Sequence, residues 1–212
     1  MSRLRLCLAS LLFATTASAC APTLAHTSTP DSARIEIDRA RLRAKLAERR
    51  AQTVKNFLAY REGRVYPIND QGGGFRHVWV DQAGNLCAAA TLLSKDWGRD
   101  AALRVGAANG GIKLADATGS VADWILTSGM TRAEMVSIQV PGFNERFGED
   151  QRQQEITRLY QIYVDVERQV NSLWNANLDL AVDQLMKRPD LAHEVLGGRV
   201  AGPGAYAQPP IG

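Results

Sequence analysis

The chain has 212 residues, which leaves room for one domain or for one domain with an appended helical element, and argues against two full domains. With 45% hydrophobic and 22% charged residues, its composition is that of a globular protein and excludes a chain that is disordered throughout. Net charge is +3, and 23 basic residues face 22 acidic ones once Arg3 and Arg5 leave with the expected leader. Because the basic stretch from Arg39 to Arg50 is interrupted by Glu48 and by leucines at helical spacing, we interpret it as a solvated helix face and expect no nucleic-acid partner.

Residues 1–19 have the three parts of a secretory signal peptide. Arg3 and Arg5 precede an apolar run from Leu6 to Ala14, which small residues follow up to Ala19. The run is too short to span a bilayer, and no later segment has the length of about 20 apolar residues that spanning requires. The sequence therefore predicts an exported chain whose only membrane contact is a lipid anchor.

Cys20 directly follows the small residues of the leader. The sequence Ala-Ser-Ala-Cys at 17–20 resembles the lipobox of bacterial lipoproteins, in which the cysteine is acylated and becomes the new N-terminus. We predict lipidation at Cys20 and, with Pro22 two residues on, sorting to the outer membrane where the organism has one. Plain secretion after cleavage at Ala19 or Ala25 is the alternative, and residues 20–30 form a flexible tether in either case.

Three cysteines limit the disulfide chemistry of the chain. Cys7 leaves with the signal peptide, and acylation of Cys20 would make Cys87 a lone thiol in an oxidising compartment. If Cys20 is free, a bridge between Cys20 and Cys87 is the one intramolecular disulfide that the sequence allows. No disulfide framework is expected.

A long helix over residues 31–62 is predicted to open the folded part, residues 31–188. Asp31 or Ser32 can cap it, and its apolar residues recur at helical spacing until Gly63. Glycine and proline then break regular structure before Val78, Trp79 and Val80 supply a short β element. The residues Asp-Gln-Ala-Gly-Asn at 81–85 predict a turn.

Short helices are expected to build a core over about residues 75–140. The alanine- and leucine-rich segment 86–93 reads as a buried helix, and residues 100–108 as a second one. Ser120 can cap a third helix over 121–127. Thr131 with Glu134 three residues later has the pattern of a capping box and predicts a fourth, over 131–139.

The longest regular pattern predicts a helix over residues 149–187. Eight positions, seven of them apolar, alternate in steps of three and four residues, which is a heptad seam: Ile156, Leu159, Tyr163, Val166, Val170, Leu173, Asn177 and Leu180. Such a seam packs along another helix, and we favour the helix over 31–62 of the same chain above a dimeric coiled coil. A tail over 189–212, rich in glycine and proline, is predicted to be disordered. The expected fold class is mainly α, with the two long helices flanking the core.

The segments FRHVWVDQAGNLCAAATLL, IKLADA and DWILTSGMTRAEMVSIQ between residues 75 and 140 resemble a domain that recurs in exported bacterial proteins. The shared pattern is an aromatic-rich strand, an Asp-x-x-Gly turn at 81–84, a Cys-Ala pair at 87–88 that opens a helix, and a junction from Trp124 to Thr131. No activity is assigned to that family. The resemblance implies a fold unit and an exported location, without a mechanism.

Cys87, His77 and Asp81 are the candidate catalytic residues. A thiol at a helix N-terminus can be activated by the helix dipole, His77 could serve as its base, and Asp81 could orient that histidine. The competing interpretation, which we favour, takes Cys87 as a small buried apolar residue among alanines and leucines.

No metal or cofactor site is predicted. His26, His77 and His193 lie far apart in the sequence and no paired cysteine motif occurs. The triglycine at 72–74 precedes a strand-like segment, whereas phosphate loops precede a helix, so a flexible turn is expected there.

The sequence leaves three functional hypotheses. The first is a non-enzymatic envelope protein, lipid-anchored or secreted, that presents a helical surface to a partner protein. The second is a thiol-dependent hydrolase or transferase centred on Cys87 with His77. The third is a redox sensor that uses the same thiol and requires it to be exposed.

Overall fold

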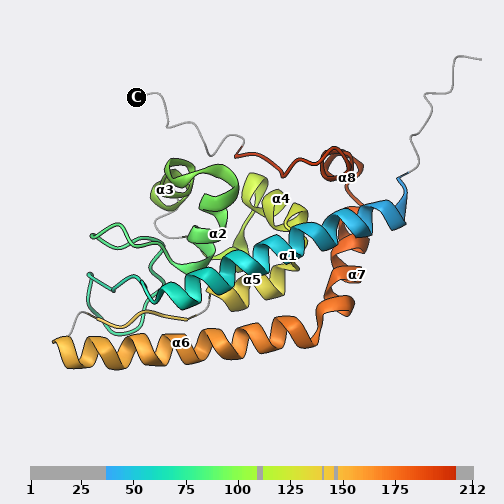
Figure 1. The fold of residues 1–212 in the computed structure, drawn as a ribbon. Helices are drawn as coiled ribbons and strands as arrows, with labels where there is room; N and C mark the ends of the chain where they lie inside the picture. The colour runs from blue at the N-terminus through green and yellow to red at the C-terminus, as the bar shows by residue number, and fades with distance from the viewer. Residues whose placement is uncertain (1–36, 109–111, 140, 146–147, 204–212) are drawn as a thin grey trace, which may run out of the picture. The chain divides into compact units, whose positions relative to one another are not determined.

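The computed structural model describes residues 37–108, 112–139, 141–145 and 148–203. Within these ranges the chain forms eight α-helices and one 3-10 turn and contains no sheet, so the mainly α class is confirmed. Figure 1 shows the order of the helices. The signal peptide, Cys20 and the tether lie outside the described residues.

Helix α1 spans Arg39–Gly63 and begins at a side-chain cap. The Asp38 carboxylate accepts hydrogen bonds from the backbone N–H groups of Ala40 and Arg41, at 2.9 and 3.0 Å. At the other end Arg64 adopts a left-handed conformation with φ of 50°. The sequence predicted a start at residue 31, and the described helix begins eight residues later because Asp38 supplies the cap.

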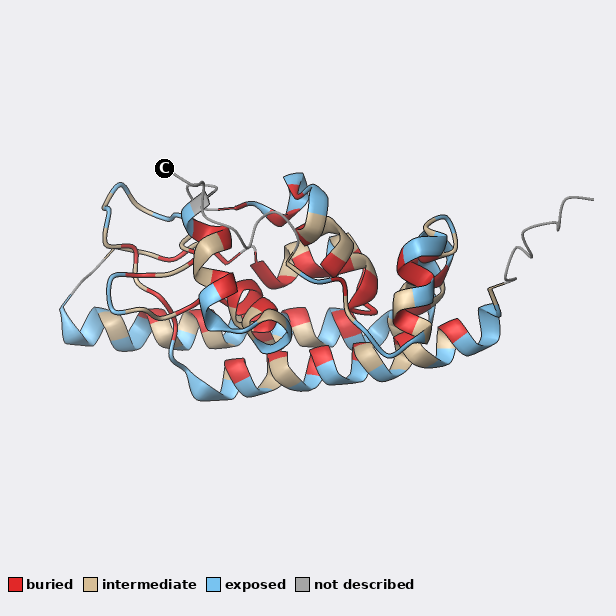
Figure 2. Ribbon diagram, turned by 90° about the horizontal axis from the view of Figure 1, so that it is seen from above, coloured by how far each residue is buried: buried red, intermediate tan, exposed pale blue. Residues whose placement is uncertain are grey.

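The short helices of the core form close to where the sequence predicts them. They are α2 (Ala88–Trp97), α3 (Arg99–Ala108), the 3-10 turn η1 (Leu114–Asp116), α4 (Gly119–Thr127) and α5 (Arg132–Gln139). The capping box of α5 is present, since Thr131 N donates to Glu134 Oε2 at 2.8 Å and Glu134 N donates to Thr131 Oγ1 at 3.3 Å. Figure 2 shows the buried residues where the elements face one another, and in α2 these are residues of its first part, Ala88–Ala90, Leu92 and Leu93.

The predicted β element is wrong. Among the described residues, the segment around Val78–Val80 makes only isolated bridges, Arg76 with Phe143 and Val80 with Leu86. The β-prone composition is real, but a strand needs a partner of comparable length to pair its backbone groups. Here each bridge joins a single pair of residues, and side chains, chiefly Asn69 and Asp81, bind other backbone groups of the loop.

The single helix predicted over 149–187 is two helices, α6 (Glu149–Ser172) and α7 (Trp174–Leu185), which meet at Leu173. The seam is buried through Leu159, Tyr163, Val166 and Val170, whereas Leu173 and Leu180 are 45% and 51% exposed. After the break, burial passes to another set of residues: Leu178, Ala181, Val182 and Leu185. The change of direction in Figure 1 lets α7 turn this face toward α1.

Both C-terminal helices pack against α1 of their own chain: α6 runs antiparallel to it, and α7 crosses it steeply (Figure 1). The rings of Phe57 and Tyr163 make an edge contact between α1 and α6, with centroids 5.7 Å apart. Nearer the start of α1, Arg43 pairs with Asp179 of α7 at 2.7 Å. The seam therefore serves packing within one chain, as we favoured from the sequence.

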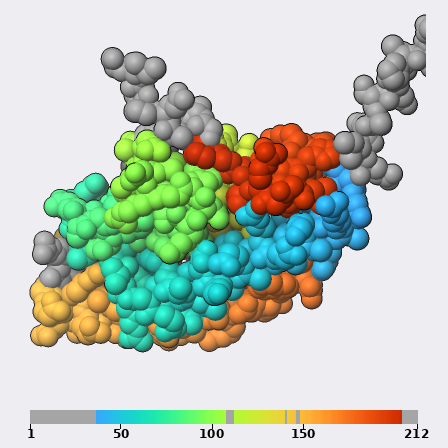
Figure 3. All heavy atoms as spheres, turned by 45° about the horizontal axis from the view of Figure 1, so that its top comes forward, coloured from blue at the N-terminus to red at the C-terminus, as the bar shows by residue number. Residues whose placement is uncertain are grey.

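The tail predicted to be disordered from residue 189 contains a helix, α8 (Pro189–Leu196). Proline at the first helical position has the fixed φ that a helix start needs, and the buried Leu191, Ala192 and Val195 dock on α1 and α4. Figure 3 shows α8, in red, lying against α1, in blue. Beyond α8, the carbonyl of Ala201 accepts a hydrogen bond from Trp97 Nε1 at 2.6 Å.

Candidate functional site

A long irregular segment stands out against the helices. Residues 64–86 connect α1 to α2 without forming a helix or a strand, and they pair with residues 141–145 through two bridges. We call these two segments together the loop layer. Loops of this length inside a compact domain are uncommon and are often functional.

The buried side chain of Asn69 holds the first half of the loop layer through hydrogen bonds to its backbone. Its side chain is 1% exposed, and its Nδ2 donates to the carbonyls of Gly72 and Gly74 at 3.1 and 2.6 Å. Its Oδ1 accepts from Gln71 N at 3.0 Å. The three glycines at 72–74 have φ of 70°, 80° and 80°, which side-chain-bearing residues rarely adopt. The triglycine, expected to be a flexible turn, is thus a defined loop wound around one buried amide.

Two carboxylates hold the two segments of the loop layer in place. Glu145 accepts a hydrogen bond from Gly74 N, and Glu155 of α6 accepts one from Asn144 N at 3.1 Å. Burial raises the pKa of Glu155, but the Arg158 guanidinium and Asn144 N outweigh it and hold that pKa below its ordinary value. Glu155 is therefore ionised at neutral pH and fixes residues 141–145 to α6.

The Asp81 carboxylate holds the last part of the loop layer, residues 81–85, in the same way. Its Oδ1 accepts from Asn85 N at 2.8 Å, and its Oδ2 accepts from Ile68 N at 3.1 Å and from Asn85 Nδ2 at 2.9 Å. The predicted turn at 81–85 is present, closed by the bond from Gly84 N to Asp81 O. Asp81 thus binds backbone and amide groups of the loop, and no hydrogen bond links it to His77 in the described part of the chain.

The loop layer and α3 line an open cavity of about 350 Å³. Both polar and apolar residues line it: Ile68, Asn69, Asp70, Gln71, Arg76, His77, Val78, Trp79, Val80, Asp81, Gln82, Leu103, Gly106 and Ala107. The volume lies at the lower end of the range for small-molecule sites. We call it the loop-layer cavity.

Trp79 forms a rigid wall of the loop-layer cavity. Its Nε1 donates to the carbonyl of Ala102 at 2.7 Å, and its ring lies directly on Gly106 of α3. A Cβ at residue 106 would stand 2.3 Å from Trp79 Cδ1, so only glycine permits this contact. A glycine inside a helix costs about 1 kcal/mol relative to alanine, and here it admits the indole.

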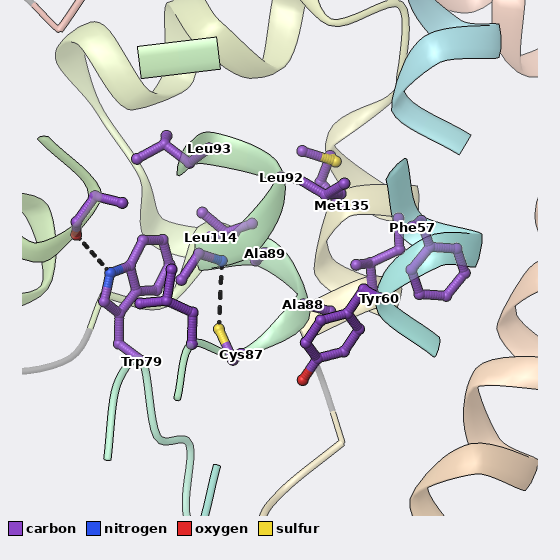
Figure 4. Packing of buried hydrophobic residues seen from close by; sticks show 14 of the residues in the cluster. Phe57, Tyr60, Trp79, Cys87, Ala88, Ala89, Leu92, Leu93, Leu114 and Met135 are labelled. Atoms are coloured by element: carbon purple, nitrogen blue, oxygen red, sulfur yellow. Dashed lines mark hydrogen bonds between the residues drawn. The ribbon is translucent and has the colours of Figure 1, made fainter. Parts of the chain in front are cut away.

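Cys87 lies in the core, outside the lining of that cavity. It is 2% exposed, caps α2 by accepting a hydrogen bond from Ala90 N at 3.4 Å, and donates its own N–H to Trp79 O at 3.0 Å. Figure 4 shows it among Trp79, Ala88 and Tyr60, with its bond to the backbone of α2 dashed. Burial raises the pKa of the Cys87 thiol to about 12. The thiol is protonated at neutral pH, which opposes a nucleophilic role.

The structure therefore separates the three residues predicted as a catalytic set. His77 is exposed and lines the loop-layer cavity with Asp81, while Cys87 is buried behind Trp79 in the core. No hydrogen bond joins His77 to Cys87 or Asp81 among the residues that the structure covers. The geometry supplies a concave surface with polar groups and places no activated nucleophile on it.

The described residues lack two further features. No group of three or more His, Cys, Asp or Glu side chains there is arranged to hold a metal ion. No helix there combines the length and the apolar character that crossing a membrane requires.

Sequence reasoning named His77 and Asp81 only as members of a catalytic set with Cys87, and it missed Asn69 and Glu145. The contacts of Glu145 reach across more than 70 residues, so no local pattern reveals them. An asparagine shortly before the triglycine was the one available signal for a loop wound around a side chain. Comparisons with protein-family models, with curated proteins and with solved structures gave no match for this chain.

Proposed function

We propose that the chain is an exported, non-catalytic binding protein of the cell envelope, and that the loop layer receives its partner protein. One observation carries the proposal. Buried polar side chains, chiefly Asn69 and Asp81, hold a surface loop in one shape around a cavity of about 350 Å³. The loop layer thus takes the place of the helical surface expected from the sequence.

The energetic argument rests on the cost of burying those side chains. Burying an amide or carboxylate costs several kcal/mol of folding free energy unless its polar atoms form hydrogen bonds. The side chains of Asn69 and Asp81 form these bonds with backbone groups of the loop. A shorter connection from α1 to α2 would need none of these groups. A loop whose shape is so defined supports recognition, because a pre-organised surface loses little entropy on binding.

An exposed aromatic residue on the loop layer supports a protein partner. Phe75 is 60% exposed, and the Arg158 guanidinium stacks on the Phe75 ring at 4.8 Å from its centroid. Aromatic and arginine side chains are the residues most often found at the energetic centres of protein interfaces. Arg158 is fixed by Glu155 at 2.7 Å, so this pair is already ordered.

The alternative, a thiol-dependent hydrolase or transferase, needs an ionised and accessible Cys87. Burial and the raised pKa of this thiol both oppose it. The same two observations oppose a redox sensor, which requires an exposed thiol. No observation on the described residues favours either of these hypotheses over binding.

Export and lipid anchoring rest on the sequence alone. Their support is the basic start, the apolar run and the position of Cys20 after small residues. Mass spectrometry of the protein from a bacterial host tests this part separately. A diacyl or triacyl cysteine at residue 20 is expected, and a free N-terminus at Cys20 or His26 would contradict it.

Site-specific photo-crosslinking in cell envelopes tests the binding proposal. A photo-reactive phenylalanine analogue at Phe75 is expected to capture a discrete partner, whereas the same analogue at exposed Gln52 of α1 serves as a matched control. The cross-link at 75 should be lost when Asn69→Ala unwinds the loop. Equal capture from both positions, or none from position 75, would count against the loop layer as the binding surface.

A further inference from the structure

A second cavity lies between the end of α1 and α2, on residues that the proposed function does not use for its partner. It has a volume of about 330 Å³ and we call it the cationic pocket. Helices α1, α2 and α3 and the two ends of the loop layer line it: Ala59, Tyr60, Gly63, Val65, Gly84, Asn85, Leu86, Thr91, Ser94, Lys95 and Arg99.

The charges of the cationic pocket all have one sign. Lys95 and Arg99 are exposed on its wall, and no aspartate or glutamate is among the residues that line it. Lys95 makes no ion pair within the described ranges of the chain. Glu62, the acidic residue nearest in sequence to the α1 part of the lining, is bound by Arg61 at 2.7 Å. Two cations that share a pocket without a counter-charge repel each other, so the pocket favours an anion.

Hydrogen-bond donors beside the two cations remain available. Arg99 uses one Nη2 bond to hold the carbonyl of Gly84, which orients the guanidinium and leaves its other N–H groups for a ligand. The Lys95 ammonium offers three further donors, and Thr91 lines the same pocket. A carboxylate or phosphate can accept several such charge-assisted bonds at once.

The remaining surface of the cationic pocket is apolar. Ala59, Leu86 and the ring of Tyr60 form part of the wall, and Val65 is 60% exposed beside it. A bare oxyanion would leave this surface in contact with water. The combination is suited to a ligand that carries one anionic group and one apolar group.

We propose that the cationic pocket binds an amphiphilic anion, in which a phosphate or carboxylate contacts Lys95 and Arg99 and an attached alkyl chain covers Val65. The chemistry is shared by free alkyl phosphates and by anionic lipid headgroups. The inference does not depend on the loop layer being a partner-binding surface, because the two proposals use different side chains.

Calorimetric titration with decyl phosphate below its micelle concentration tests the proposal. One binding site is expected, and Lys95→Gln should weaken it about tenfold, since one charge-assisted contact is worth about 1.4 kcal/mol or more. Lys95→Arg should keep most of the affinity. Lys187→Gln, which removes an exposed cation just after α7, is the matched control and should leave binding unchanged.

Two further titrations separate the parts of the ligand. Val65→Ser should weaken decyl phosphate and leave inorganic phosphate, the weaker ligand, unaffected. Vesicles of phosphatidylglycerol should compete with decyl phosphate if the natural source is a lipid, and should fail to compete if it is a free amphiphile. Absence of decyl phosphate binding, or an equal loss in Lys95→Gln and Lys187→Gln, would overturn the proposal. Circular dichroism confirms that each variant keeps its helices.

Discussion

The guanidinium of Arg50 and the carboxylate of Glu134 form a two-pronged ion pair in the interior, with Nη1–Oε2 at 2.9 Å and Nη2–Oε1 at 2.5 Å. Arg50 is 0% exposed and also donates to the carbonyls of Gly129 and Val170. Its guanidinium stacks on Trp174 at 4.7 Å. This one side chain of α1 therefore contacts α5, the turn before it, the end of α6 and the start of α7.

Removal of Arg50 is expected to be costly because Glu134 would be left buried without its partner. We predict that Arg50→Met lowers the free energy of unfolding by about 3–5 kcal/mol in urea titrations. In the double variant Arg50→Met/Glu134→Gln the loss should be smaller than the sum of the single losses. The exposed pair of Arg168 and Asp165 provides the control, since Arg168→Met should cost less than about 1 kcal/mol. A loss of that small size at Arg50 would refute this account of the interior.

Acid should destabilise the fold through the same pair. Burial raises the pKa of Glu134, but hydrogen bonds from Arg50, Thr131 and Asn177 outweigh it, and the pKa lies below its ordinary value of 4.5. The native state therefore binds fewer protons than the unfolded one below that pH. The contribution of Glu134 to the free energy of unfolding is fully present above pH 4.5 and is lost as pH falls through the pKa of this carboxyl in the native state. Urea midpoints at pH 7, 4.5 and 3 should fall more steeply for the parent than for Glu134→Gln, and parallel curves would contradict this.

Gly106→Ala should damage the wall of the loop-layer cavity. A methyl group there would lie 2.3 Å from Trp79 Cδ1, so the indole must move and its bond to Ala102 O must break. We expect a loss of about 1–3 kcal/mol together with a changed tryptophan fluorescence, despite the better helix propensity of alanine. Gly63→Ala is the control, because no atom lies within 4 Å of its added Cβ and its stability should stay level or rise slightly. A stabilised Gly106→Ala would show that Trp79 does not rest on this glycine.

We predict that the helical seam of α6 does not form a dimer interface and that the chain is a monomer. Val166 and Val170 are 8% and 1% exposed within a single chain, so no second copy is needed to cover them. Light scattering of a chain beginning at Asp31 is expected to report one copy. A dimer that dissociates on changing both valines to aspartate would instead place the seam between chains.

Local patterns predicted most of the helices, because helix caps and apolar spacing depend on residues that are close in the sequence. Thr131 and Glu134 are three residues apart and gave α5 its correct start. The break at Leu173 has no such signal, since neither glycine nor proline interrupts the run. It follows from packing, because Leu178 and Leu185 reach Leu42 and Leu46 of α1 only after α7 turns.

The candidate site was predictable only where its residues are close in sequence. His77 and Asp81 are close in sequence and were predicted as partners of Cys87 in a catalytic set; both line the loop-layer cavity, whereas Cys87 does not. Asn69 and Glu145 hold the loop through backbone bonds between distant segments, which composition and spacing do not show. The same holds for Val78–Val80, whose strand-like composition could not reveal that no partner strand exists in the described residues.

The state of Cys87 distinguishes a binding protein from a thiol enzyme most directly. We predict that iodoacetamide at pH 7 fails to label the native protein and labels it fully in denaturant, because the thiol is buried and its pKa is raised to about 12. Cys87→Ser should cost about 1–3 kcal/mol by burying a hydroxyl that needs a stronger partner. Rapid labelling of the native protein that is lost in His77→Ala, with the fold retained, would contradict the account and identify Cys87 as a nucleophile.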